Sequence, residues 1–156
     1  TPLIATTRGV VDGLKVYRDH LAGWSYGSDE RKVAINLPVY VNKDGKKAKA
    51  DVRETIDNYI DALKEMREAS TQRGGNIVEA SGGSRRSVPD LTFDSIIRNY
   101  SAIGDPEECI ETIGRFKEIL GPQEIMCWFN IGGLLPHEDV VRSMTLFSEK
   151  VAPYFQ

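Results

Sequence analysis

The chain has 156 residues, of which 20 are Lys or Arg and 23 are Asp or Glu, so its formal net charge is −3. This length suits one globular domain, and the near balance of interspersed charges argues against a nucleic-acid-binding surface. No stretch approaches the roughly 20 apolar residues of a membrane-spanning helix, so we expect no membrane segment. The two cysteines, Cys109 and Cys127, are too few for a disulfide framework and indicate free thiols in a reducing, cytoplasmic compartment.

The first predicted unit is a short apolar strand over residues 3–6, followed by a helix. Apolar residues recur along that helix at the spacing of one face, at Val10, Leu14, Tyr17 and Leu21. A second strand is predicted over residues 33–41, where both sets of alternate residues are largely apolar, as in a parallel sheet covered on both sides. Pro38 has no amide hydrogen to donate, so this strand is expected to be irregular or bulged there.

A strong helix is predicted over residues 47–69, because apolar residues repeat at helical spacing opposite a charged face. The pattern dissolves over residues 70–90, which contain two Gly-Gly pairs and five Ser or Thr residues. A structureless stretch of this length is typical of a lid, a binding loop or a disordered linker. Arg85 and Arg86 within it are candidates for contact with an anionic ligand.

Residues 91–100 fit a helix and a strand equally well. Asp105 and Pro106 then provide an N-cap and a first helical residue, and Glu108 is placed to complete a capping box. A short strand over residues 124–129 follows this helix, and a last helix ends at Pro153. The alternation of helices with short apolar strands predicts an α/β fold with a parallel sheet.

The residues by themselves name no reaction. His20 and His137 are far apart and lack a metalloprotease pattern, and no zinc-type cysteine spacing is present, so no metal site is expected. The turn at residues 130–133 (Asn-Ile-Gly-Gly) follows a strand and precedes a helix, at the edge where parallel α/β proteins bind ligands. It is therefore a candidate phosphate-binding turn, with an ordinary tight connection as the alternative.

Several short motifs occur together in the C-terminal third of the chain: Gly104-Asp105-Pro106-Glu107 at a helix start, Ile-Met-Cys-Trp-Phe at 125–129, Gly132-Gly133, Pro136-His137-Glu138, Leu146-Phe147, and Val151-Ala152-Pro153. This combination resembles the end of the bacterial luciferase-like monooxygenase family, with Asp105 in place of the usual Thr. Residues 2–7 are similar to the family's strand before a long helix. The resemblance spans nearly the whole chain.

The resemblance implies that residues 1–156 are the C-terminal portion of a (β/α)8 TIM barrel, with about three parallel strands, flanking helices and a flexible lid-like loop at residues 70–90. A complete barrel needs about 250 residues, so this chain cannot close one. The implied activity is flavin-dependent monooxygenation, in which reduced FMN from a flavin reductase and O2 oxidise a small organic substrate. Two alternatives stay open, namely a deazaflavin-dependent oxidoreductase and a non-catalytic flavin-binding or partner subunit.

The cofactor contacts that the resemblance implies are strand-end residues, namely Thr6, Thr7, Asn36 and Asn130. The catalytic residues are unknown, and we expect them to lie upstream of Thr1. The 156-residue piece alone is therefore expected to be inactive and to bind FMN weakly or not at all. A partial barrel leaves a sheet edge open on each side, which predicts either pairing with a second chain in a homo-oligomer or a longer parent protein that supplies the remaining half of the barrel.

Overall fold

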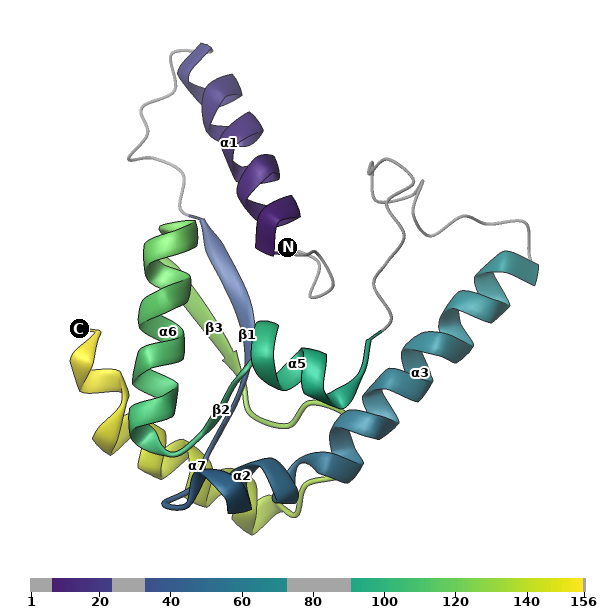
Figure 1. Cartoon of the computed structure of the whole chain (residues 1–156), viewed down its shortest axis with the longest axis vertical. Coiled ribbons are helices and arrows are strands. Elements are labelled where there is room, and N and C mark those ends of the chain that lie inside the picture. The colour runs from purple at the N-terminus through teal and green to yellow at the C-terminus, as the bar shows by residue number, and fades with distance from the viewer. Residues whose placement is uncertain (1–6, 24–32, 73–90, 156) are drawn as a thin grey trace.

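The computed structural model describes residues 7–23, 33–72 and 91–155, which form helices around a small sheet (Figure 1). In chain order the elements are α1 (Thr7–Gly23), β1 (Ala34–Val41), α2 (Gly45–Asp51), α3 (Arg53–Gln72), α5 (Phe93–Asn99), β2 (Ala102–Gly104), α6 (Pro106–Leu120), β3 (Glu124–Trp128), α7 (His137–Lys150) and the 3-10 turn η2 (Ala152–Tyr154). Within these described ranges, no helix combines the length and apolarity needed to cross a bilayer.

The sheet has three parallel strands in the spatial order β2-β1-β3, which confirms the predicted α/β class. The first half of β1 pairs with β3, from Ala34 opposite Glu124 onward, and its last residues pair with β2. The strand β3 therefore lies beside β1 and not beside β2, its predecessor in the chain. Pro38 pairs opposite Trp128 at the end of the β1–β3 ladder, where a missing amide hydrogen disrupts the sheet least.

Two elements differ from the sequence-based expectation. The helix predicted over residues 47–69 is two helices, α2 and α3, which meet at Val52, the C-cap of α2. The ambiguous segment 91–100 forms the helix α5, and the strand β2 that follows it was not predicted, because three residues are too short to show a periodicity. The predicted strand over residues 3–6 lies outside the described residues, as does most of the predicted lid.

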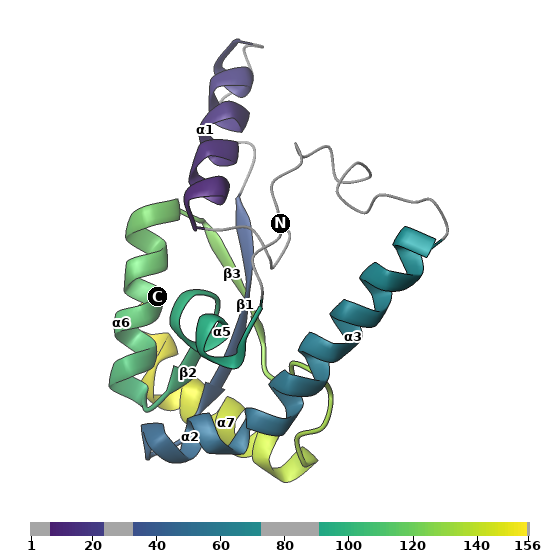
Figure 2. The same ribbon diagram turned by 45° about the vertical axis from the view of Figure 1, so that its right-hand side comes forward.

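Two apolar clusters lie on opposite sides of β1, because alternate side chains of a strand point to opposite faces. Ile35, Leu37 and Val39 pack with residues of α6 and with Val151. Tyr40 packs instead with residues of α2, α3 and α5. Figures 1 and 2 show α6 and α3 on opposite sides of the strands in both views. The sheet is thus covered on both faces, as the two apolar faces of β1 predict.

The start and end of α6 follow the predicted signals. The Asp105 side chain accepts a hydrogen bond from the Glu108 amide, and the Glu108 side chain accepts one from the Asp105 amide, which completes the capping box. Gly121 ends the helix with a φ of 55°, a left-handed conformation that glycine adopts without strain. The N-terminal cap at Asp105 places the C-terminal end of β2 directly before the helix.

Candidate functional site

The C-terminal ends of the strands hold a polar network around Asp51. The Tyr40 hydroxyl donates to one carboxylate oxygen of Asp51 at 3.2 Å, and the Asn42 amide donates to the same oxygen at 3.1 Å. The Lys47 ammonium donates to the other oxygen at 2.7 Å. Burial, reinforced by Asp51, raises the pKa of Tyr40 from 10.0 to about 12, so its hydroxyl stays protonated near neutral pH. A cavity of about 380 Å³ beside this network is lined by Tyr40, Asn42 and Arg142 among others.

The half-buried carboxylate of Glu108 ties α2 to the end of β2. The Glu108 side chain accepts from the Lys49 ammonium at 2.5 Å and from the Asp105 amide at 3.0 Å. A Cβ placed on Gly45 or on Gly104 would collide with the Glu108 carboxylate. Both positions therefore need glycine, because the Glu108 side chain fills the space that a Cβ would occupy. The end of β2 is held against α2 by the contacts of Glu108 with Lys49 and Asp105.

The Asn-Ile-Gly-Gly turn after β3 is fastened to α3. The Thr55 hydroxyl donates to the Ile131 carbonyl at 2.5 Å and accepts from the Leu134 amide at 3.1 Å. Gly132 has a φ of 81°, and a Cβ there would collide with the backbone carbonyl of Thr55. The close approach of this turn to α3 therefore accounts for Gly132. Gly133 has a similar φ of 79°, but a Cβ on it would meet nothing within 4 Å.

The structure places the sequence-predicted site residues in different settings. Thr6 lies outside the described residues, and Thr7 is the first residue of α1. Asn36 lies in the middle of β1, opposite Met126 of β3. Asn130 lies in the turn after β3, where its side-chain oxygen accepts a hydrogen bond from the Leu135 amide at 3.2 Å. Asn36 therefore lies within the β1–β3 pair, whereas Asn130 lies beyond its end.

Asn36 has an unusual environment. Its side-chain oxygen is buried and has no hydrogen-bond partner within the described part of the chain. Leaving such an acceptor unpaired costs about 1 to 3 kcal/mol. By strand alternation and register, Met126 and Trp128 point to the same face as Asn36. We call these three residues the inner face.

The inner face is mostly apolar and partly open. Met126 exposes 63% of its surface, although it lies in the sheet. Trp128 is half-buried and packs edge-on against Tyr59 of α3, with ring centroids 5.6 Å apart. An exposed apolar surface can hold a flat apolar group, and the unpaired Asn36 oxygen buried beside it can accept a hydrogen bond from that group once a small side-chain movement uncovers it.

Sequence reasoning missed the residues that organise these sites. Tyr40 and Asp51 are eleven positions apart, and Thr55 lies 76 positions from its acceptor Ile131. No local pattern marks such partners, because only the packing of α2 and α3 against the strand ends brings them together.

Comparisons with known proteins agree with the sequence motifs. No family model matches the chain. The chain is 27% identical over 155 residues to the alkanal monooxygenase alpha chain of Photobacterium leiognathi, and the match covers 94% of this chain and 43% of that protein. It is 25% identical over 146 residues to the protein of the same name from Aliivibrio fischeri, with 84% and 39% covered. The resemblance to the luciferase-like monooxygenases is confirmed.

Two solved monooxygenase structures share the fold. The monooxygenase RslO1 from Streptomyces bottropensis has a TM-score of 0.65 and 21% identity, with 99% of this chain and 40% of that chain covered. The oxygenating constituent of 3,6-diketocamphane monooxygenase from Pseudomonas putida, a type II Baeyer-Villiger monooxygenase in complex with FMN, has a TM-score of 0.66 and 19% identity, with 97% and 41% covered. The chain thus spans less than half the length of these relatives, and its three parallel strands form part of an α/β barrel fold.

Proposed function

We propose that this chain is the C-terminal part of a flavin-dependent monooxygenase and that its inner face contributes to the flavin site. The proposal rests on the unpaired buried oxygen of Asn36, which lies on a partly open apolar strand face. It is supported by the alkanal monooxygenase relatives and by the structural neighbour that holds FMN. The reaction would use reduced FMN from a flavin reductase and O2 to oxidise a small organic substrate, with alkanals as the first class to test.

The residues present fit the flavin ring better than the flavin phosphate. The ring is flat and apolar and carries N–H and C=O groups, so the Asn36 oxygen would accept one hydrogen bond from it while Met126 and Trp128 contact its surface. Asn130 already uses its side-chain oxygen within the turn, and Gly132 is explained by the contact with α3. Thr6 and Thr7 stay predictions as cofactor contacts, since Thr6 lies outside the described residues and Thr7 begins α1.

The role of this chain would be to bind, orient and shield. When bound, the reduced flavin would be the group that reacts with O2. Asn36 would fix the ring by one hydrogen bond, and the Trp128–Tyr59 pair would exclude water from one side of the ring. The Asp51 network holds Tyr40 as a neutral donor at the strand ends. None of these groups needs to change its charge near neutral pH.

Binding of lumiflavin, which is the flavin ring without its phosphate tail, tests this proposal by fluorescence quenching. We expect weak binding of lumiflavin and an equal affinity for FMN. Asn36→Leu should weaken lumiflavin binding by about fivefold or more, because the loss of one hydrogen bond costs about 1 kcal/mol. Asn36→Leu should also stabilise the free chain, because it removes the unpaired oxygen. Asn99→Leu, on an exposed position of α5, is the matched control.

Three outcomes would change the conclusion. Unchanged lumiflavin binding in Asn36→Leu would remove Asn36 from the site. Much tighter binding of FMN than of lumiflavin would show that the chain holds the phosphate after all. Tighter binding of a 5-deazaflavin ring would favour the deazaflavin-dependent alternative.

We also propose that the chain associates with further strands, in a homo-oligomer. The strands β2 and β3 are the two edges of the sheet, and open edges pair readily with other strands. Light scattering at increasing protein concentration should show dimers or larger species. A chain that stays monomeric throughout would contradict this.

A further inference from the structure

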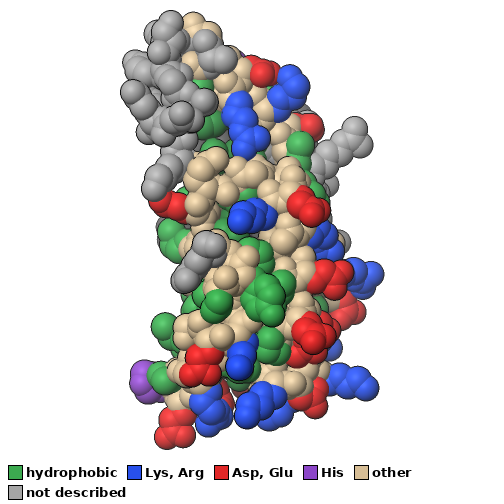
Figure 3. All heavy atoms as spheres, turned by 90° about the vertical axis from the view of Figure 1, so that its left-hand side faces the viewer, with side chains coloured by type: hydrophobic (Ala, Val, Ile, Leu, Met, Phe, Trp, Pro, Cys, Tyr) green, Lys and Arg blue, Asp and Glu red, His purple; other side chains and the backbone are tan. Residues whose placement is uncertain are grey.

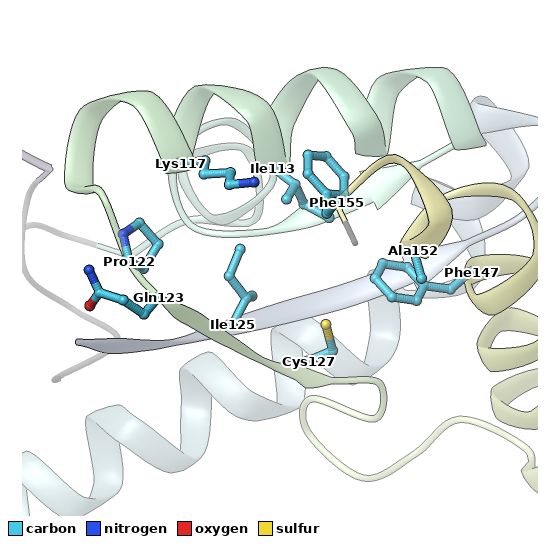
Figure 4. A pocket seen from close by; sticks show the side chains of 9 residues that line it. All are labelled: Ile113, Lys117, Pro122, Gln123, Ile125, Cys127, Phe147, Ala152 and Phe155. Carbon is cyan, nitrogen blue, oxygen red and sulfur yellow. The ribbon is translucent and has the colours of Figure 1, made fainter. Parts of the chain in front are cut away.

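A second cavity lies on the side of the sheet away from the inner face. It has a volume of about 250 Å³ and lies between α6, β3, α7 and η2 (Figure 4). Ile125 and Cys127 line it from β3, and they alternate with Met126, so they point to the opposite face. The cavity is therefore separate from the surface that we propose for the flavin.

The walls of this cavity are mostly apolar. Ile113 of α6 is buried, and the aromatic rings of Phe147 and Phe155 close the end near the C-terminus. Phe147 is held by an edge-on contact with Phe129, with ring centroids 5.4 Å apart. Burial raises the pKa of the Cys127 thiol above 9.0, so it stays neutral. Figure 3 shows apolar side chains gathered over the lower half of the face that α6 and the C-terminal turn present.

One cationic group, Lys117 of α6, lies at this cavity. Its ammonium nitrogen lies 5.6 Å from the centroid of the Phe155 ring, and Figure 4 shows the side chain extending over the cavity. Within the described part of the chain, Lys117 forms no ion pair, and no acidic residue lines the cavity. Gln123 at the opposite end is occupied, since its side-chain oxygen accepts from the Val33 amide at 2.7 Å.

We propose that this cavity is a binding site for a small amphipathic anion, specifically a medium-chain monocarboxylate. The alkyl chain would lie against Ile113, Ile125 and Phe147, and the carboxylate would accept hydrogen bonds from Lys117. A neutral occupant would desolvate the ammonium without pairing it, whereas a carboxylate pairs with it. The volume is below the 300 to 1,000 Å³ that is typical for drug-sized ligands, which excludes a long alkyl chain.

Titrations with octanoate and octan-1-ol, followed by NMR of the isoleucine methyl groups, test the proposal on the full chain. Octanoate should shift the methyl signals of Ile113 and Ile125, which line the cavity, and leave those of Ile56 and Ile96 in the other cluster unchanged. Octan-1-ol has the same chain and no charge, so it should bind more weakly.

Two types of variant separate the charge from the cavity. Lys117→Met should weaken octanoate binding by about fivefold, which corresponds to about 1 kcal/mol for an exposed ion pair, and should not weaken octan-1-ol binding. Lys46→Met, on an exposed position of α2, makes the same change in net charge and should alter neither affinity. Ala152→Leu should fill the cavity and abolish both titrations; Cys127→Leu repeats the test if Ala152→Leu fails to fold.

The proposal is overturned by any of three results. One is the absence of any shift of Ile113 and Ile125 at ~10 mM octanoate, well above a millimolar dissociation constant. Another is equal binding of octanoate and octan-1-ol with no effect of Lys117→Met. The third is a shift of the methyl signals in both clusters together, which would indicate non-specific association. Because none of these measurements involves flavin, their failure is distinguishable from failure of the proposed monooxygenase function.

Discussion

Replacing Gly132 by alanine tests whether the turn after β3 is shaped by its contact with α3. Gly132 has a φ of 81°, and an added Cβ would meet the Thr55 carbonyl, which is backbone and cannot rotate away. The neighbouring Gly133 has a φ of 79° and open space around the same added atom. Gly132→Ala and Gly133→Ala therefore share the backbone strain and differ in the collision.

The two variants should differ clearly in stability. A left-handed conformation costs a residue with a side chain about 1 to 2 kcal/mol, which is the whole loss expected for Gly133→Ala. Overpacking adds about 1 to 3 kcal/mol, so Gly132→Ala should lose about 2 to 5 kcal/mol of unfolding free energy. The added collision also pushes the turn away from Thr55 and weakens the hydrogen bonds that the Thr55 hydroxyl makes with it.

Urea unfolding followed by circular dichroism measures the difference. With a slope of about 2 kcal/mol/M in urea, Gly132→Ala should lower the midpoint by about 1 to 2.5 M. Equal midpoints for the two variants would refute the argument that close packing against α3 requires Gly132. Gly132 would then be free for another role, such as the phosphate contact that its place in the turn first indicates.

The remaining predictions concern buried polar groups, and each is checked by unfolding curves. Thr55→Val should lose about 2 to 3 kcal/mol, because two backbone groups of the turn lose their partner, whereas Thr55→Ser should retain most of the stability. Ser143→Ala should lose about 1 to 3 kcal/mol, because the buried Val41 amide donates to its hydroxyl at 2.7 Å, and the exposed Ser148→Ala should stay within about 0.5 kcal/mol. Stability should fall as the pH rises from 9 to about 12, because burial raises the pKa of Cys109 from 9.0 to about 12 and the unfolded chain loses this proton first. Cys109→Ala should reduce that fall without removing it, because the raised pKa of Tyr40 contributes over the same range; an unchanged slope would contradict the assignment.

Local signals predicted the parts of the fold that depend on neighbouring residues. Asp105, Pro106 and Gly121 mark the two ends of α6, because caps are made by residues within one helical turn. The apolar run at 33–41 forms the central strand β1, since both of its faces are covered. Val52 was not recognised as the break between α2 and α3, because no glycine or proline marks it.

The candidate site was predictable only in part. The sequence predicts both Asn36 and Asn130 to be strand-end residues, yet Asn36 has an unpaired buried oxygen and Asn130 has a partner in its own turn. The sequence contains no sign of this difference, because it depends on which groups of β3 and of the following turn come within hydrogen-bond distance. From the sequence, Gly132 is a candidate ligand contact, because its actual neighbour Thr55 is far away in the chain and local residues do not reveal it.

The sequence by itself determined the α/β class, the helix ends and the likeness to luciferase-like monooxygenases, because these depend on short-range patterns and recurring motifs. The tertiary structure alone decided that β3 lies beside β1 and not β2. It also decided which polar atoms are left unpaired and where the cavity beside Lys117 forms. Strand neighbours, unpaired atoms and cavities all depend on contacts between distant segments. These contacts form only when the chain folds, so short-range sequence patterns do not reveal them.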